Sequence, residues 1–191
     1  TVLADAFVKP LIGDYCRDIG SALKNSGIRG PCSFLKSDGG TTLLERAPGR
    51  PVDILLSGLA GGIVGGKYFA KTAGFKNAIT LDMGGTSCDV GLVTDGEQQF
   101  TTEFEIEWGL PVALPIIEVR TLGAGGGSIA WITPEGNLNV GPISAGAAPG
   151  PMCYPQGGKE PTITDANLVL GRLPSKLIGG EISLSVERSR Q

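Results

Sequence analysis

The segment Asp82-Met83-Gly84-Gly85-Thr86-Ser87-Cys88-Asp89 joins two mainly apolar runs, which begin at Asn77 and end at Thr94. Both runs are short and rich in aliphatic and β-branched residues, which is typical of strands. The glycines between them allow the backbone to turn tightly. The sequence therefore predicts a buried strand over residues 77–82 and a second strand over residues 88–94, joined by a glycine-containing turn.

The residue types in this segment fit a phosphate group and a metal ion. Backbone N–H groups of a glycine-rich turn can approach an anion closely, and hydroxyls add hydrogen bonds. Carboxylates supply the oxygen ligands that Mg²⁺ prefers. The segment lacks the GxxxxGK[ST] pattern, and a strand follows it, so it is not a Walker loop. An ordinary glycine hairpin is the alternative interpretation. The residues that carry the phosphate and metal prediction are Asp82, Gly84, Gly85, Thr86, Ser87 and Asp89.

A second glycine loop, Gly123-Ala-Gly-Gly-Gly-Ser128, follows another apolar run. One interpretation is that the loop forms part of an anion or substrate pocket, with Gly125, Gly126 and Gly127 in contact with a cofactor. The other interpretation is a tight crossover in which two backbones pack closely.

Asp165 is the remaining carboxylate that we consider for a catalytic site. Thr164 is a suitable N-cap for a short helix over residues 165–170. Asp165 then has an alternative role, because an acidic residue in the first turn stabilises a helix by about 0.3–1 kcal/mol. The sequence alone leaves both roles open.

Other stretches have clear secondary-structure signals. Apolar residues at spacings of three and four predict an amphipathic helix from Pro10, a favourable first helical position, to Gly27. A glycine-rich helix is predicted from Ser57 to Gly74. Each glycine costs about 1 kcal/mol relative to alanine, so this helix requires close packing against a neighbour. The pair Asp95-Gly96 predicts a hairpin turn.

The composition excludes several classes of function. The chain has 191 residues, a net charge of −3 and no histidine. Ser-His-Asp and Cys-His nucleophiles and histidine-containing zinc sites are therefore excluded within this chain. The acidic balance argues against a nucleic-acid partner and against a polybasic membrane surface, and no apolar run is long enough to span a bilayer. The four scattered cysteines predict a reduced, cytoplasmic protein.

Five long segments occur in a fixed order: SGLAGGIVG (57–65), LDMGGTSCDV (81–90), TLGAGGGSIA (121–130), VGPISAGAAPGP (140–151) and PTITDANLVLG (161–171). Together they resemble the A subunit of the hydantoinase/oxoprolinase family, which includes ATP-dependent N-methylhydantoinase, 5-oxoprolinase and a carboxylase branch. The resemblance covers essentially the whole chain. Two departures are visible, since Leu59 stands where the family usually has proline and Cys88 where it usually has threonine. Cys88 removes one hydroxyl from the predicted phosphate turn.

The resemblance implies an α/β fold, namely part of an actin/Hsp70/sugar-kinase-like (RNase H-like) ATPase with a mixed sheet and flanking helices. It implies that residues 1–56 form the C-terminal part of a first RNase H-like domain and residues 57–74 a connecting helix. Residues 75–191 would form the N-terminal part of a second such domain. Family members are several times longer, so we expect an internal fragment that is inactive in isolation.

The resemblance also implies a function: a fragment of an ATP-dependent cyclic-amide hydrolase of the hydantoinase/5-oxoprolinase type, which contributes the second phosphate-binding hairpin. The alternatives are a fragment of an acetone/acetophenone-type carboxylase and a non-catalytic, partner-binding half-module. A small cyclic amide is the implied substrate, a B subunit or domain the implied partner, and the full-length form is expected to oligomerise.

Matching motif positions assigns roles to individual residues. ATP and Mg²⁺ are the implied cofactors, with Asp82 and Asp89 positioning the metal or its water. These two carboxylates and Asp165 are the catalytic candidates. The implied cofactor contacts are Gly84, Gly85, Thr86 and Ser87, together with Gly125, Gly126 and Gly127.

Overall fold

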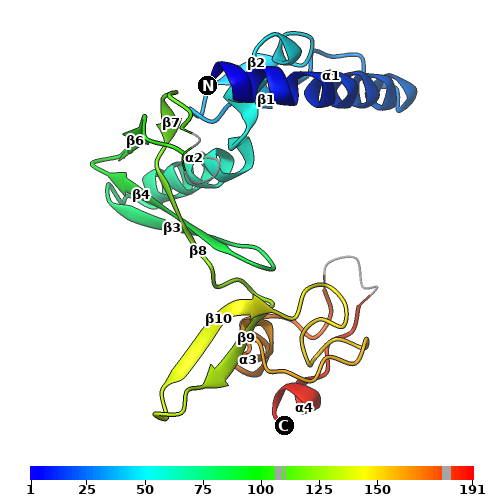
Figure 1. Cartoon of the computed structure of the whole chain (residues 1–191), viewed down its shortest axis with the longest axis vertical. Helices are drawn as coiled ribbons and strands as arrows, with labels where there is room; N and C mark the ends of the chain where they lie inside the picture. The colour runs from blue at the N-terminus through cyan, green and yellow to red at the C-terminus, as the bar shows by residue number, and fades with distance from the viewer. Residues whose placement is uncertain (106–108, 110, 178–181) are drawn as a thin grey trace. The chain divides into compact units, whose positions relative to one another are not determined.

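A computed structural model describes residues 1–105, 109, 111–177 and 182–191 of the chain. The fold is mixed α/β with short, mostly antiparallel strand pairings (Figure 1). The chain divides into two compact units. Unit 1 comprises Thr1–Thr80 and Gly91–Arg120, and unit 2 comprises Leu81–Val90 and Thr121–Gln191. The predicted division at residues 56 and 74 into parts of two RNase H-like domains stays a prediction.

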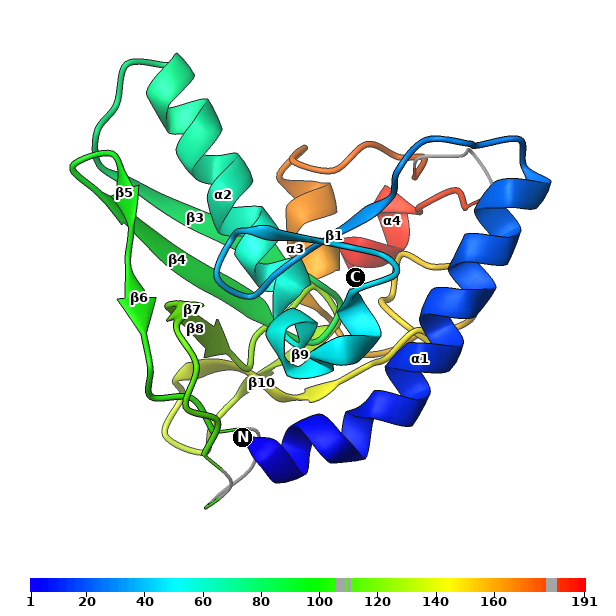
Figure 2. The same cartoon turned by 90° about the horizontal axis from the view of Figure 1, so that it is seen from above.

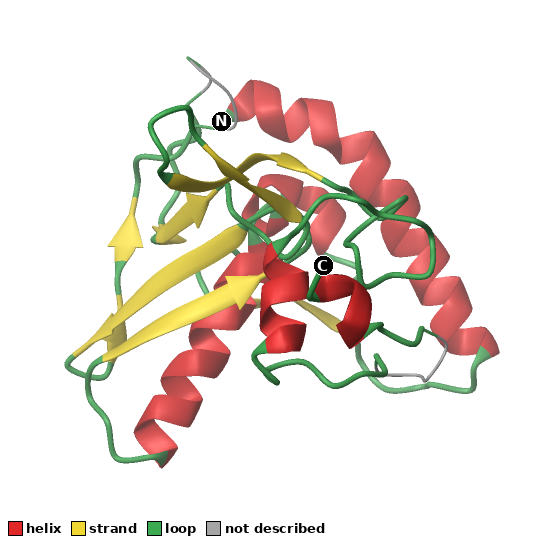
Figure 3. Cartoon of the chain, turned by 90° about the horizontal axis from the view of Figure 1, so that it is seen from below, coloured by secondary structure: helices red, strands yellow, loops and turns green. Residues whose placement is uncertain are grey.

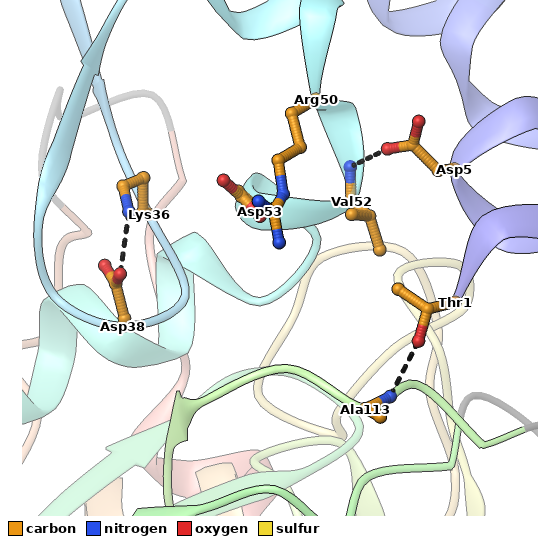
Figure 4. A network of polar contacts seen from close by, with 8 residues as sticks. All are labelled: Thr1, Asp5, Lys36, Asp38, Arg50, Val52, Asp53 and Ala113. Atoms are coloured by element: carbon orange, nitrogen blue, oxygen red, sulfur yellow. Dashed lines mark hydrogen bonds and ion pairs between the residues drawn. The ribbon is translucent and has the colours of Figure 1, made fainter.

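Unit 1 begins with helix α1 (Val2–Asn25), which starts eight residues before the predicted position and contains Pro10 within it. Tertiary contacts explain the earlier start. Ala4 is buried in a cluster with Val52 and its neighbours, and the Asp5 carboxylate accepts a hydrogen bond from the Val52 N–H at 3.1 Å (Figure 4). These contacts hold the first turns of α1, so Pro10 does not mark its beginning.

Strands β1 (Ser33–Leu35) and β2 (Thr41–Leu43) pair antiparallel, and two short 3₁₀ helices, η1 (Ala47–Gly49) and η2 (Pro51–Ile54), follow. The turn between the strands contains an ion pair of 2.7 Å between Lys36 and Asp38 (Figure 4). Burial raises the pKa of the Asp38 carboxyl, but the hydrogen bonds from Lys36 and the Gly40 N–H outweigh burial and lower the pKa. This turn is therefore held by its own polar contacts.

Helix α2 (Ser57–Thr72) confirms the predicted glycine-rich helix. It lies against the sheet of unit 1 (Figure 2). An added Cβ at Gly66 would lie 2.2 Å from Cγ2 of Thr80, and one at Gly91 would lie 2.4 Å from Ile63. Because no side chain fits at these positions, the glycines allow the close packing that the helix requires. No helix in the described ranges is both long and apolar enough to cross a bilayer.

Strands β3 (Ala78–Met83), β4 (Cys88–Thr94), β5 (Glu97–Gln98) and β8 (Val119–Leu122) form one sheet, with β4 beside each of the other three. A smaller ladder pairs β6 (Phe100–Thr101) with β7 (Ile116–Ile117). Both strands predicted around the glycine turn are confirmed, but the expectation that the first is buried is wrong. Ile79 and Leu81 are 67 % and 70 % exposed, because no described segment covers their side of β3.

Unit 2 contains strands β9 (Ser128–Ile132) and β10 (Leu138–Ser144), which pair antiparallel, and helices α3 (Ile163–Val169) and α4 (Val186–Ser189). The connection from β10 to α3 is irregular (Figure 3). Cys153, Leu168 and Leu184 form the buried core of the unit.

Candidate functional site

The predicted glycine turn occupies residues 84–87, between the last residue of β3 and the first of β4. The Gly84 N–H closes the turn by donating to the Ser87 carbonyl at 2.9 Å. Gly84, Gly85 and Thr86 are exposed, and Ser87 is half-buried. The strand–turn–strand arrangement predicted from the sequence is therefore confirmed, with the four predicted phosphate contacts together in one turn.

The second glycine loop holds this turn from one side. The Gly126 N–H donates to the Gly84 carbonyl at 2.9 Å, and the Gly127 N–H donates to the Gly85 carbonyl at 2.7 Å. In a planar trans peptide the C=O and N–H groups point in opposite directions. The N–H groups of Gly85 and Thr86 share peptide planes with these two carbonyls. Both N–H groups therefore point away from the N–H groups of Gly126 and Gly127.

The two backbones are in close contact at residues 125–127 of the loop. An added Cβ at Gly125 would lie 2.4 Å from the Ser87 nitrogen and 2.5 Å from the Thr86 carbonyl carbon. The three glycines predicted as cofactor contacts thus lie against the backbone of the turn, as the crossover interpretation expects. A direct contact between Gly125–Gly127 and a cofactor stays a prediction.

Gly84 and Gly85 differ from the glycines of the loop. A Cβ at Gly85 would meet no atom within 4 Å, and one at Gly84 would meet only the Ser87 carbonyl oxygen, at 3.8 Å. Neither is among the described residues with left-handed φ values. Neither crowding nor backbone conformation within the described chain requires glycine at these two positions. The absence of side chains at these two positions leaves the backbone of the turn uncovered there.

The two aspartates lie on either side of the turn. Asp82 is exposed on β3, and Asp89 is half-buried on β4, where its Oδ1 accepts a hydrogen bond from the Thr121 hydroxyl at 2.6 Å. In the described part of the chain, no group of three or more Cys, Asp or Glu residues could hold a metal ion. Protein sites commonly hold Mg²⁺ with one or two carboxylates plus phosphate oxygens and water. Asp82 and Asp89 could supply two such carboxylates, and their predicted role in holding Mg²⁺ stays a prediction.

Cys88, the departure from the usual threonine, is buried with 4 % of its surface exposed. Its side chain is therefore not on the exposed surface of the turn. A hydroxyl at this position would also be buried, so the departure removes no exposed hydrogen-bond donor.

Asp165 lies in a different setting from Asp82 and Asp89. It is 2 % exposed, and its carboxylate accepts five hydrogen bonds from within the chain. Burial raises the pKa of the Asp165 carboxyl, but the hydrogen bonds from Thr162 and Cys153 outweigh burial and lower the pKa. The donors are the N–H groups of Met152 (3.1 Å), Cys153 (2.7 Å) and Thr162 (2.9 Å), and the hydroxyls of Thr162 (2.7 Å) and Ser189 (2.9 Å).

The predicted N-cap Thr164 is wrong, because Thr162 caps α3 and forms a reciprocal capping box with Asp165. Thr164 lies one residue inside the helix, where its N–H and its hydroxyl each donate to the Gly126 carbonyl at 2.8 Å. The prediction from the sequence missed the capping role of Thr162, although the sequence contains the spacing that indicates it. Two threonines precede Asp165, and only the one at spacing three can form the capping box.

A family model described as Hydantoinase/oxoprolinase matches residues 1–191. The chain belongs to this family. The resemblance predicted from the five segments is therefore confirmed. The solved structure of the ATP-dependent caprolactamase from Pseudomonas jessenii is similar to this chain with a TM-score of 0.72 and 40 % identity. That similarity covers 95 % of this chain and 26 % of the caprolactamase chain.

Two further proteins similar to this chain differ in the reactions that their names describe. The solved nucleotide-free structure of acetone carboxylase matches with a TM-score of 0.70 and 32 % identity, over 91 % of this chain and 24 % of the carboxylase chain. The 5-oxoprolinase of Saccharomyces cerevisiae is 39 % identical over 176 residues, which is 90 % of this chain and 13 % of that protein. The chain spans about a quarter or less of each of these proteins.

Proposed function

We propose that this chain supplies a phosphate-binding hairpin to an ATP-dependent enzyme that opens cyclic amides. The observation that carries the proposal is the pair of N–H groups of Gly85 and Thr86. They point away from the Gly126 and Gly127 N–H groups that hold the turn, and the two glycines of the turn carry no side chain that could obstruct an approaching anion. Oriented backbone N–H groups are suited to bind phosphate oxygens. The similar proteins named above include an ATP-dependent caprolactamase and a 5-oxoprolinase.

In this proposal Gly84, Gly85, Thr86 and Ser87 contact phosphate oxygens through their N–H groups and hydroxyls. Asp82 and Asp89 hold Mg²⁺ directly or through its water. Bound ATP would supply the phosphoryl group that converts an unreactive amide oxygen into a leaving group. The chain's own contribution is positioning and charge neutralisation, which are the main requirements of phosphoryl transfer.

We further propose that the chain forms part of an actin/Hsp70/sugar-kinase-like ATPase, with α2 as the connecting helix between two RNase H-like domains. The remaining nucleotide contacts would come from other parts of a longer polypeptide, and a B subunit or domain would act with it. Isolated, the 191-residue chain would then bind Mg-ATP weakly or not at all.

Replacing Asp82 in the full-length protein tests this function. Asp82→Asn keeps the size of the side chain and removes the charge that would face the metal. We expect ATP turnover to fall by about a hundredfold or more, as is common when a charge-stabilising group is lost. Asp95→Asn is the matched control, because Asp95 is an exposed aspartate in the turn at the other end of β4 and asparagine tolerates its φ of 54°. Equal turnover in both variants would contradict the proposal.

The similarity to acetone carboxylase favours a second candidate, an ATP-dependent carboxylase. ATP consumption by the full-length protein separates the two functions. Stimulation by a hydantoin, 5-oxoproline or another lactam without bicarbonate supports the hydrolase. Stimulation by a ketone only when bicarbonate is present supports the carboxylase.

A further inference from the structure

The Gly126 residue connects the phosphate turn to helix α3. Its N–H donates to the Gly84 carbonyl at 2.9 Å, and its carbonyl accepts from both the N–H and the hydroxyl of Thr164 at 2.8 Å. The turn and the first turn of the helix are thus joined through a single residue. The Thr164 hydroxyl belongs to the only side chain in the described ranges that donates to this loop carbonyl.

The helix end that carries Thr164 is firmly held. Thr162 and Asp165 form the capping box, and Asp165 also accepts hydrogen bonds from the 152–153 backbone and from Ser189. The Ala130 N–H donates to the Pro161 carbonyl at 2.8 Å, which attaches the start of the helix to β9. Thr164 therefore projects from a fixed point of unit 2.

The loop between Thr164 and the turn has little room to shift. An added Cβ at Gly126 would lie 2.9 Å from the Thr164 Oγ1, and one at Gly127 would lie 2.9 Å from both the Gly85 carbonyl and the Ser144 Oγ. Ser128 is fully buried, and its Oγ accepts from the Gly125 N–H at 2.9 Å. A shift of the Thr164 side chain should therefore also shift the backbone of residues 84–87.

We propose that Thr164 is a positioning residue, which sets the direction of the Gly85 and Thr86 N–H groups through Gly126. This inference rests on the proposed phosphate-binding function of the turn. Thr164 itself contacts Gly126, and it acts on the nucleotide through the backbone of residues 84–87.

The test compares three variants of the full-length protein. Thr164→Val removes the hydroxyl and keeps the shape and the backbone N–H, and Thr164→Ser keeps the hydroxyl. Thr133→Val is the matched control, because the Thr133 hydroxyl bonds the Asn137 N–H and the Glu135 side chain within the turn between β9 and β10. Two quantities are measured, the hydrogen exchange of the peptide over residues 82–88 without nucleotide and the Kd for Mg-ATP.

We expect Thr164→Val to speed exchange over residues 82–88 and to weaken Mg-ATP binding about three- to tenfold, the range for one lost hydrogen bond. Thr164→Ser should restore both quantities, and Thr133→Val should leave both unchanged. Unchanged hydrogen exchange over residues 82–88 in Thr164→Val would overturn the positioning role, whether or not the Kd for Mg-ATP changes. Faster exchange with an unchanged Kd would also overturn it.

Failure of the underlying function is seen separately. If Asp82→Asn leaves Mg-ATP binding and turnover unchanged, the turn is not a phosphate site and the inference falls with it. Exchange over residues 82–88 still reports whether Thr164 holds the turn.

Discussion

Strand β4 has a turn at each end, and the two turns are built on different principles. At residues 95–96, Asp95 and Gly96 take φ values of 54° and 83°, the left-handed conformation of a tight hairpin. The segment just before β3 completes this turn, since the Gly96 N–H donates to the Lys76 carbonyl at 2.7 Å and the Asp95 N–H to the Asn77 Oδ1 at 2.9 Å. Its glycine is explained by backbone conformation.

The turn at residues 84–87 depends on distant segments. Its carbonyls are held by Gly126 and Gly127, and that loop is held in turn by Thr164 of α3. Neither Gly84 nor Gly85 has a left-handed φ value. An added Cβ at either position would not be crowded by the described residues. A turn whose two glycines are required neither by crowding nor by backbone conformation among the described residues is suited to receive a ligand. The predictions below test this difference.

The largest effect on stability is expected at Asp165, the base of this support. Asp165→Asn replaces a carboxylate that accepts five hydrogen bonds with an amide that has one acceptor oxygen and two donors of its own. We expect the free energy of unfolding of the chain to fall by about 4 kcal/mol. Urea unfolding measures the change, with Asp95→Asn as the control. A loss as small as that of the control would show that the support is dispensable.

The effect of Asp165 also depends on pH. Its pKa is lowered in the folded state, so its ionisation stabilises the fold at pH values above the ordinary carboxyl pKa of 3.8. This contribution is lost as pH falls through the lowered pKa. The difference in unfolding free energy between wild type and Asp165→Asn should therefore stay constant from pH 7 to about pH 5 and shrink below 3.8. A difference that grows on acidification would contradict the assignment.

A smaller loss is expected at Gly125, where the loop meets the turn. In Gly125→Ala the new Cβ would lie 2.4 Å from the Ser87 nitrogen, so one of the two backbones must move. We expect a loss of about 3 kcal/mol in unfolding free energy, typical of overpacking against an atom that cannot yield. Gly123→Ala is the matched control, because its Cβ would meet no atom within 4 Å. Equal stability of the two variants would show that loop and turn are not in close contact.

The two turns also illustrate which features could be predicted from the sequence and which could not. Asp95-Gly96 and the strands around residues 84–87 follow local rules of turn chemistry and alternation, and both were predicted. The cap of α3 was missed, although the spacing of three between Thr162 and Asp165 is a local signal that the sequence contains. The start of α1 was also missed, because it is decided by contacts with Val52, which is 47 positions from Asp5. The bonds from Gly126 to the turn likewise join residues more than 40 positions apart in the sequence, beyond the reach of any local pattern.

The smallest effect on stability is expected at Gly85, where the comparison is most sharply tested. An added Cβ at Gly85 meets no atom within 4 Å, so Gly85→Ala should change the unfolding free energy by less than about 0.5 kcal/mol. If the turn binds phosphate as proposed, the same methyl group would obstruct the approach of phosphate oxygens to the N–H groups. We expect the Kd of the full-length protein for Mg-ATP to rise about tenfold, equivalent to about 1.4 kcal/mol. Gly123→Ala again serves as the control, with both quantities unchanged. A large loss of stability in Gly85→Ala would give this glycine a structural reason, and the turn would then resemble the one at residues 95–96.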